Sequence, residues 1–248
     1  MISASGLQIL LYQLQFSHAW MFFVLALCWL WAKKSMFKQF SYEFIYHFVS
    51  NLTDLRYRVK VEGQKNLPAH GPVLIISNHV SFIDWAFLGR ITKEQIRFVM
   101  WYYYYEKPIL KTMFSSAGAI PIAGKKEDEL RLKSAFKEIE NALRKNQRIL
   151  YFPEGGITKN GEVDSFRPGL LEILKQHKEP ITLVPAYLDG MWESIFSRNP
   201  RRWDNFISRI FNRRSIVVRL GKPLIVDERI DLESLRKRIL DLKGESDY

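Results

Sequence analysis

A histidine and an aspartate five residues apart, His79 and Asp84, have the side chains needed for general-base chemistry. Residues 71–77 before them combine a turn signal with a β-branched run, which predicts a short buried strand. His79 then follows a strand's carboxyl end, where open α/β sheets place ligands. Two residues five apart on one helix point roughly 140° apart. We therefore expect His79 in the connection and Asp84 in the first turn of the next helix, with the carboxylate folded back onto the imidazole to fix its tautomer.

Two further features of these segments admit more than one interpretation. Ser81 stands three residues before Asp84, which is also the spacing of a capping box, and both roles can coexist. Residues 147–152 predict a second strand, which Pro-Glu-Gly-Gly ends, so Glu154 lies at a similar sheet edge. Gly155 and Gly156 would let a polar ligand approach the backbone closely. The alternative is a turn with a solvated Glu154.

Four ordered blocks then resemble a known family. They are Asn78-His79 with Asp84, Gly-Ala-Ile-Pro-Ile at 118–122, Phe-Pro-Glu-Gly at 152–155 and Val-Pro-Ala at 184–186. Their order and spacing over residues 60–225 resemble the glycerolipid acyltransferases, which acylate glycerol-3-phosphate and lysophospholipids. The resemblance implies His79 as general base and Asp84 as its orienter. It places around the acceptor's polar end the residues Asn78, Ser81, Glu154, Gly155 and Gly156.

The chemistry that the resemblance implies is modest. An acyl thioester has a good leaving group, so the acceptor hydroxyl needs only deprotonation during attack, and a positioned His contributes about 10²–10⁴ in rate. No protein nucleophile is required, although Ser77 and Ser81 stay open as alternatives; Cys28 lies in a distant apolar segment. A single cysteine and the absence of zinc-type spacing predict no disulfide and no metal. We expect no tightly bound cofactor, with acyl-CoA or acyl carrier protein as donor substrate.

Two arginines that the family often carries for phosphate are absent here. Ile122 is followed by Ala-Gly-Lys-Lys, and Gly156 by Ile-Thr. The cations that could replace them are Lys125, Lys126, Lys159 and Arg167, although Lys offers a point charge in place of the bidentate guanidinium. Residues 155–169 resemble the acyltransferase parts of bacterial lysophospholipid-recycling proteins. The acceptor is therefore 1-acylglycerol-3-phosphate or, alternatively, a 2-acylglycerophosphoethanolamine-type lipid.

The N-terminal 32 residues contain no charged side chain, and residues 19–32 are an unbroken apolar run. Neither a positive n-region nor a small-residue cleavage site is visible, so a secretory signal is not predicted. Fourteen apolar residues fall short of the about 20 that span a bilayer, and we favour a helix lying in one leaflet over a full span. Lys33, Lys34 and Lys38 follow, which predicts a catalytic domain on the cytoplasmic face, the inner membrane if the source is bacterial. Residues 36–55 predict a second interfacial helix.

The net charge of +11 and pI near 9.6 indicate polyanionic partners. Residues 192–214 interleave arginines with large aromatic residues, which suits a membrane interface; an ordinary solvated helix is the alternative. No recognition motif accompanies the charge, so we expect a membrane lipid surface and no nucleic acid. The aromatic run 101–105 lines an acyl groove or packs beneath one.

The sequence predicts an α/β fold with a mostly parallel central sheet covered by helices. Strands are expected near 57–62, 72–77, 96–101, 148–152, 181–187 and 215–220, and helices at 126–146 and 230–242. Residues 1–56 are expected to form the membrane-associating helical segment and residues 57–248 the acyltransferase domain. Two other functions stay open: a lipid hydrolase, for which no Gly-x-Ser-x-Gly elbow is present, and a non-catalytic membrane-binding protein.

Overall fold

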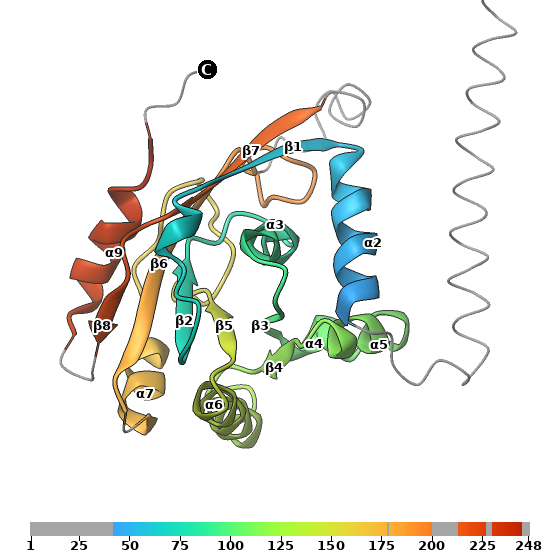
Figure 1. Ribbon diagram of the computed structural model, residues 1–248. Helices are drawn as coiled ribbons and strands as arrows, with labels where there is room; N and C mark the ends of the chain where they lie inside the picture. The colour runs from blue at the N-terminus through green and yellow to red at the C-terminus, as the bar shows by residue number, and fades with distance from the viewer. Residues whose placement is uncertain (1–41, 178, 200–212, 227–229, 245–248) are drawn as a thin grey trace, which may run out of the picture.

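The computed structural model describes residues 42–177, 179–199, 213–226 and 230–244. These residues form one eight-stranded sheet in the order β1-β7-β6-β2-β5-β3-β4, with β8 beside β6 (Figure 1). Five of the seven strand pairings are parallel, and β6 pairs antiparallel with β7 and β8. The strands are β1 (Tyr57–Glu62), β2 (Val73–Ser77), β3 (Ile96–Trp101), β4 (Ile120–Ile122), β5 (Arg148–Tyr151), β6 (Ile181–Asp189), β7 (Arg214–Leu220) and β8 (Leu224–Val226).

Helices cover both faces of this sheet (Figure 1). In chain order they are α2 (Tyr42–Asp54), α3 (Asp84–Leu88), α4 (Tyr102–Tyr105), α5 (Pro108–Ser116), α6 (Glu129–Arg144), α7 (Gly169–Gln176) and α9 (Leu232–Leu240), with short 3-10 turns at Gln64–Asn66 and Gly89–Ile91. Within β2, Val73 and Ile75 face the core that includes α3, whereas Leu74 and Ile76 face the core that includes α6, α7 and α9. This alternation places β2 between two apolar layers, as expected of a central strand.

The mostly parallel sheet predicted from the sequence is confirmed. All six predicted strands are present, while β4 and β8, of three residues each, were not predicted. The helix expected over 126–146 begins only at Glu129, because the Asp128 carboxylate accepts the backbone N–H of Arg131 as an N-cap. Asp231 caps α9 in the same way. The buried residues of α6 include Phe136, Ile139 and Leu143, which lie three and four residues apart and so share one face of the helix.

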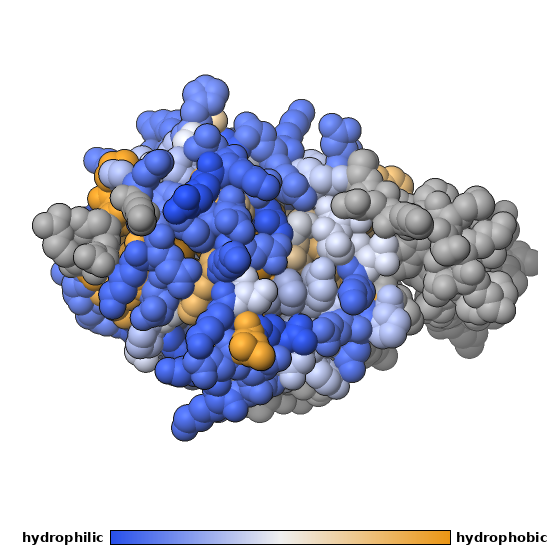
Figure 2. All heavy atoms as spheres, turned by 90° about the horizontal axis from the view of Figure 1, so that it is seen from below, coloured by the Kyte–Doolittle hydropathy of each residue, from blue (hydrophilic) through white to orange (hydrophobic). Residues whose placement is uncertain are grey.

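The predicted membrane-associating segment lies largely outside the described residues, including the apolar run 19–32 and the lysines that follow it. Its described part is α2, which joins the core through Ile45. The same helix exposes Phe44, Phe48 and Leu52 to solvent. Of the helices that the structure describes, none has the length and apolar character to cross a membrane. Much of the basic and aromatic segment 192–214 also lies outside the described residues, and the face shown in Figure 2 is mostly hydrophilic.

Candidate active site

His79 and Asp84 meet just beyond the carboxyl end of β2. His79 lies in the connection, and α3 begins at Asp84. The Nδ1 atom of the imidazole lies 2.8 Å from Oδ2 of the carboxylate. The predicted geometry is confirmed: the carboxylate folds back from the first helical turn. Because a carboxylate accepts the hydrogen bond, the neutral ring carries its proton on Nδ1, which leaves Nε2 with a lone pair able to act as a base.

Asp84 is fully buried and surrounded by donors. Besides the imidazole, its Oδ2 accepts the backbone N–H groups of Val80 at 2.7 Å and Ser81 at 2.9 Å. The Ser81 hydroxyl donates to Oδ1. The Asp84 carboxylate thus accepts the Ser81 backbone N–H, as in a capping box. The Ser81 hydroxyl, however, donates to the same carboxylate and does not cap a helical N–H. A fully buried acceptor with four donors suits an ionised carboxylate, and it holds the His79 ring in one orientation.

The connection between β5 and α7, residues 152–168, fixes His79 from the other side. The Phe152 ring stacks on the imidazole at a centroid distance of 4.1 Å and an interplanar angle of 17°. The His79 backbone N–H donates to Oε1 of Glu154 at 2.8 Å, and its carbonyl accepts the Thr158 N–H at 2.9 Å. The imidazole side chain is 20% exposed. In the part of the chain that the structure describes, its Nε2 makes no hydrogen bond, so this nitrogen can face a substrate hydroxyl.

Glu154 is a buried link between two loops. Its Oε2 accepts the backbone N–H of Asp164 at 2.9 Å, while Oε1 holds the His79 N–H. Burial raises the pKa of Glu154 to about 7, and these two hydrogen bonds offset part of that effect. Glu154 is only 4% exposed, and its direct contact with the acceptor's polar end stays a prediction.

Asn78 bridges β2 and β6. Its side-chain carbonyl accepts the Leu188 N–H at 2.7 Å, and its amide donates to the Leu188 carbonyl at 3.0 Å. The Ser77 hydroxyl donates to the same side-chain carbonyl at 3.2 Å. Asn78 is only 1% exposed. The polar side chains of this block are thus directed at the protein itself: Asn78 to β6 and Ser81 to Asp84.

Arg167 is one of two predicted phosphate ligands, with Lys159, that belong to the connection 152–168, which contacts His79. The Arg167 side chain packs over Gly155, where a Cβ atom would come within 2.6 Å of Arg167 Cδ. The backbone N–H of Arg167 donates to the Pro153 carbonyl at 2.8 Å. Gly155 has a φ of 68°, which further favours glycine. A Cβ at Gly156 would meet no atom within 4 Å, so the backbone there is open to a ligand.

Lys125 and Lys126 lie in the exposed turn after β4, at the edge of the sheet. Three strand spacings separate β4 from β2, a distance of about 14 Å at the usual spacing of neighbouring strands. The structure therefore brings Arg167 together with the His79 loop, and it leaves the two lysines at the rim. Lys159 is exposed and directly follows Thr158, whose N–H binds the His79 carbonyl.

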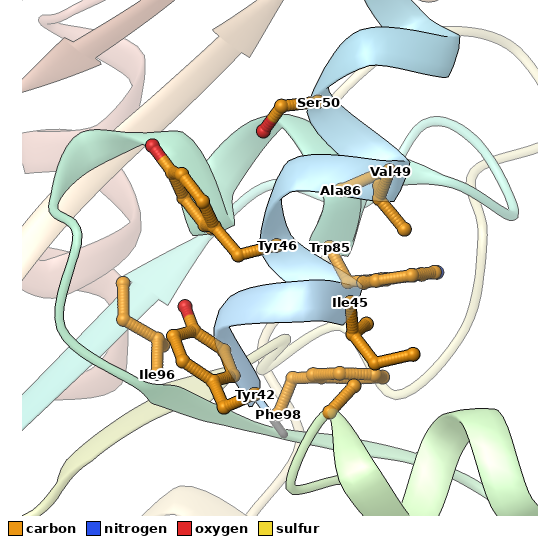
Figure 3. A pocket seen from close by; sticks show the side chains of 11 residues that line it. Tyr42, Ile45, Tyr46, Val49, Ser50, Trp85, Ala86, Ile96 and Phe98 are labelled. Carbon is orange, nitrogen blue, oxygen red and sulfur yellow. The ribbon is translucent and has the colours of Figure 1, made fainter. Parts of the chain in front are cut away.

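An apolar pocket lies beside the site, between α2 and the aromatic side chains of α3 and β3 (Figure 3). Its walls include Tyr42, Ile45 and Tyr46 from α2. Opposite them, the Trp85 ring stacks on Phe98 at 4.8 Å. Because Trp85 directly follows Asp84, the packing of α2 against this wall supports the first turn of α3.

The described residues thus form an α/β sheet with a His–Asp pair at its carboxyl edge, and Nε2 of the imidazole is open to a ligand. Residues 58–189 match the family model for acyltransferases, and the chain belongs to the acyltransferase family. The chain is 27% identical over 239 residues to a 1-acyl-sn-glycerol-3-phosphate acyltransferase of Saccharomyces cerevisiae, covering 90% of this chain and 71% of the relative.

A second relative is the chloroplastic 1-acyl-sn-glycerol-3-phosphate acyltransferase LPAT1 of Arabidopsis thaliana, 30% identical over 135 residues. That match covers 54% of this chain and 36% of the relative, so the chain spans only about a third of that protein. The fold is similar to the crystal structure of the 1-acyl-sn-glycerophosphate acyltransferase PlsC from Thermotoga maritima. The TM-score is 0.59 at 18% identity, covering 81% of this chain and 75% of that one. This likeness supports the fold.

Several groups that position His79 carried no sequence signal of their own role. Phe152 belongs to a block that was recognised, but nothing in the pattern indicated that its ring stacks on the imidazole. Thr158 and Asp164 act through backbone N–H groups, which every residue except proline possesses. Of the groups that position His79, Asp84 was predicted in this role, whereas Glu154 was singled out for contact with the acceptor.

The elevated pKa of Glu154 predicts a pH-dependent stability. Between its usual value of 4.5 and about 7, the folded protein keeps a proton that the unfolded chain releases. The free energy of unfolding therefore falls as pH rises through this window, by roughly 1–3 kcal/mol from this group. In Glu154→Gln the contribution disappears, which denaturant titrations at about pH 4.5 and about pH 8 would measure.

The same substitution tests the link to His79. Gln offers one acceptor oxygen, so its amide would face one of the two backbone N–H groups, and we expect a roughly tenfold loss of turnover. Glu162→Gln, a change at an exposed carboxylate in the same connection, is the matched control. An identical pH dependence of stability in wild type and Glu154→Gln would show that Glu154 does not titrate in this window.

Proposed function

We propose that this chain transfers a fatty acyl group from an acyl thioester to the free hydroxyl of a lysophospholipid, with 1-acyl-sn-glycerol-3-phosphate as the acceptor. The observation that carries this proposal is the 2.8 Å contact between His79 Nδ1 and buried Asp84, which leaves Nε2 available as a base. The names of the relatives in yeast and Arabidopsis support the acceptor.

The geometry supports direct transfer. Nε2 of His79 takes the proton of the acceptor hydroxyl while the hydroxyl oxygen bonds to the thioester carbonyl carbon. Asp84 stabilises the imidazolium that forms. The tetrahedral intermediate then breaks its C–S bond, and the leaving thiolate takes the proton from the imidazolium. The products are a diacyl phospholipid and a free thiol, and His79 returns to its neutral form.

Arg167 is the cation that we assign to the acceptor phosphate. It is exposed, and its side chain packs against Gly155 in the connection that holds His79. A guanidinium can bind phosphate through two parallel hydrogen bonds. Lys125 and Lys126 lie at the rim, where they would add long-range attraction for an anionic lipid.

Arg167→Ala is expected to raise the KM for 1-acylglycerol-3-phosphate by roughly 10- to 100-fold, because a charge-assisted bidentate contact is lost. Arg167→Lys should recover only part of this loss. The matched variant Lys125→Ala/Lys126→Ala should change KM only a few-fold, and its effect should vanish at high salt. Steady-state kinetics at two ionic strengths would measure this. A larger effect from the lysine pair would move the phosphate site to the turn after β4.

The acceptor and donor also imply a membrane surface. A lysophospholipid resides in or near a bilayer, and α2 exposes Phe44, Phe48 and Leu52 along the helix, with the exposed Leu55 just beyond its end. We propose that the chain works at the cytoplasmic face of a membrane, with its N-terminal segment in one leaflet and acyl-CoA or acyl carrier protein arriving from the aqueous side. Flotation of the full chain with vesicles tests this placement.

An ethanolamine-type lysophospholipid is the second candidate acceptor. It is favoured by the absence of an arginine after Gly156, where Ile157 and Thr158 follow. Thr158 is buried, its N–H donates to the His79 carbonyl and its hydroxyl donates to Asn160, so it offers no cation to a phosphate. A panel of lysophospholipids that differ only in headgroup, supplied with acyl-CoA or acyl carrier protein, separates the two. Preference for 1-acylglycerol-3-phosphate supports the first proposal, preference for the ethanolamine lipid supports the second, and release of fatty acid without a diacyl product contradicts both.

A further inference from the structure

An exposed cluster of aromatic side chains adjoins the catalytic loop, and the proposed reaction does not use it. We call it the aromatic patch: Phe82, Trp101, Tyr103 and Tyr104. The Trp101 ring stacks on Tyr103 at 5.2 Å and meets Tyr104 edge-on at 5.7 Å. The Tyr104 ring in turn meets Phe82 edge-on at 5.6 Å. Phe82 stands between His79 and Asp84, so the patch is continuous with the loop that holds the base.

The patch is open to solvent. Phe82 is 40% exposed, Trp101 43% and Tyr103 48%, which makes them three of the larger apolar exposures among the described residues. Apolar side chains that gather in one exposed patch, unlike singly scattered ones, mark interaction sites. An acyl chain bound along a protein needs an enclosed groove, whereas these rings lie on an open surface. A flat partner fits them better than a single lipid tail.

Cations surround the patch. Lys107 Nζ lies 3.9 Å from the centroid of the Tyr103 ring. Lys111 is exposed on α5, and Lys125 and Lys126 follow Ile122, which pairs with Trp101 across β3 and β4. None of these four lysines forms an ion pair with a described residue. Of the nearby acidic groups, Glu106 and Asp128 pair with Arg131 and Glu129 pairs with Lys133, while Glu127 accepts the Trp101 indole N–H and keeps its charge.

We propose that the aromatic patch is a membrane-docking surface, which places the rings at the headgroup level of an anionic bilayer with the lysines against lipid phosphates. Tyrosine and tryptophan are enriched at this depth because their rings are apolar and their tips polar. Basic residues beside them add attraction to anionic lipid. The surface is continuous with α2 and its exposed apolar side chains, since α5 contacts α2 and both lie beside α4 (Figure 1). The inference rests on the proposed function only in that the acceptor is a membrane lipid.

Site-specific fluorescence tests the docking directly. A polarity-sensitive thiol label is attached to Tyr103→Cys in a Cys28→Ala background, and the full chain is mixed with phosphatidylcholine vesicles with and without phosphatidylglycerol. The control label is on Ile225→Cys, because Ile225 is 69% exposed on β8, on the other side of the molecule (Figure 1). Lipids with a quencher near the headgroup should quench the label at position 103 and not at 225, more strongly with phosphatidylglycerol.

A second measurement separates docking from substrate binding. In Trp101→Ser/Tyr103→Ser, the ratio of activity on vesicle-embedded acceptor to activity on a monomeric short-chain acceptor should fall roughly tenfold. Ile225→Ser should leave this ratio unchanged. Equal quenching of the labels at 103 and 225 would overturn the proposal. An unchanged activity ratio would also overturn it, and if both activities fell equally, the patch would bind the acyl donor. The fluorescence needs no turnover, so its failure is distinct from failure of the proposed activity.

Discussion

His79→Ala should lower turnover by about 10² to 10⁴, because the acceptor hydroxyl then has no base to take its proton. The effect should appear in kcat for every acceptor, since the imidazole acts on the reacting hydroxyl and not on the headgroup. KM should change little, because Nε2 forms its bond only as the reaction proceeds. Initial rates of diacyl product formation over a range of acceptor concentrations, at saturating donor, would measure both quantities.

His70→Ala is the matched control for this result. His70 is exposed in the turn before β2 and has no place in the site. Its removal should leave kcat unchanged, which excludes a general effect of losing a histidine. Product formation that persists undiminished in His79→Ala, with folding intact, would mean that another group accepts the proton or that the Ser77 or Ser81 hydroxyl attacks the thioester.

Asp84→Asn should be almost as damaging, with a loss on the order of 10³ in kcat. The amide has only one acceptor oxygen for four donors, and its NH₂ group would face Nδ1 or a backbone N–H. A ring that accepts at Nδ1 carries its proton on Nε2 and cannot act as a base there. Stability should also fall, by about 1–3 kcal/mol, because buried donors lose their partner.

The effects on rate and on stability can be separated. Ser81→Ala removes the hydroxyl bond to Asp84 but keeps the contact with His79, so it should lower stability with only a modest effect on kcat. Asp189→Asn, at the end of β6 where it pairs with Arg219, is the matched control for a lost carboxylate. If Asp84→Asn lowered stability and left kcat near that of wild type, Asp84 would serve the fold of the loop alone.

Much of the fold followed from patterns within single segments. The β-branched run of β2 and the abrupt end of β5 at Pro153 located the two strands that position the site, and the five-residue step from His79 to Asp84 predicted the turn between them. The short β4 and β8 were missed because three residues carry too little periodicity to distinguish a strand from a loop.

The hydrogen-bond partners of the polar side chains around His79 were much harder to predict. Asn78 and Glu154 were expected at the acceptor, and that role stays a prediction; no pattern indicated that their side chains bind the backbone of Leu188 and of His79 and Asp164. Such partners are set by how distant loops fold together, and backbone groups leave no mark on the sequence. The same limit applied to Arg167, whose place beside Gly155 became evident only in three dimensions.

The most direct test of the proposed function is the coupling between thiol release and diacyl lipid formation. The full chain would be supplied with acyl-CoA and 1-acyl-sn-glycerol-3-phosphate in vesicles, and both products would be quantified over the same interval. Direct acyl transfer with His79 as base predicts one diacylglycerol phosphate for each thiol released. Thiol release matched by free fatty acid, or no thiol release at all, would contradict the assignment of this chain as a lysophospholipid acyltransferase.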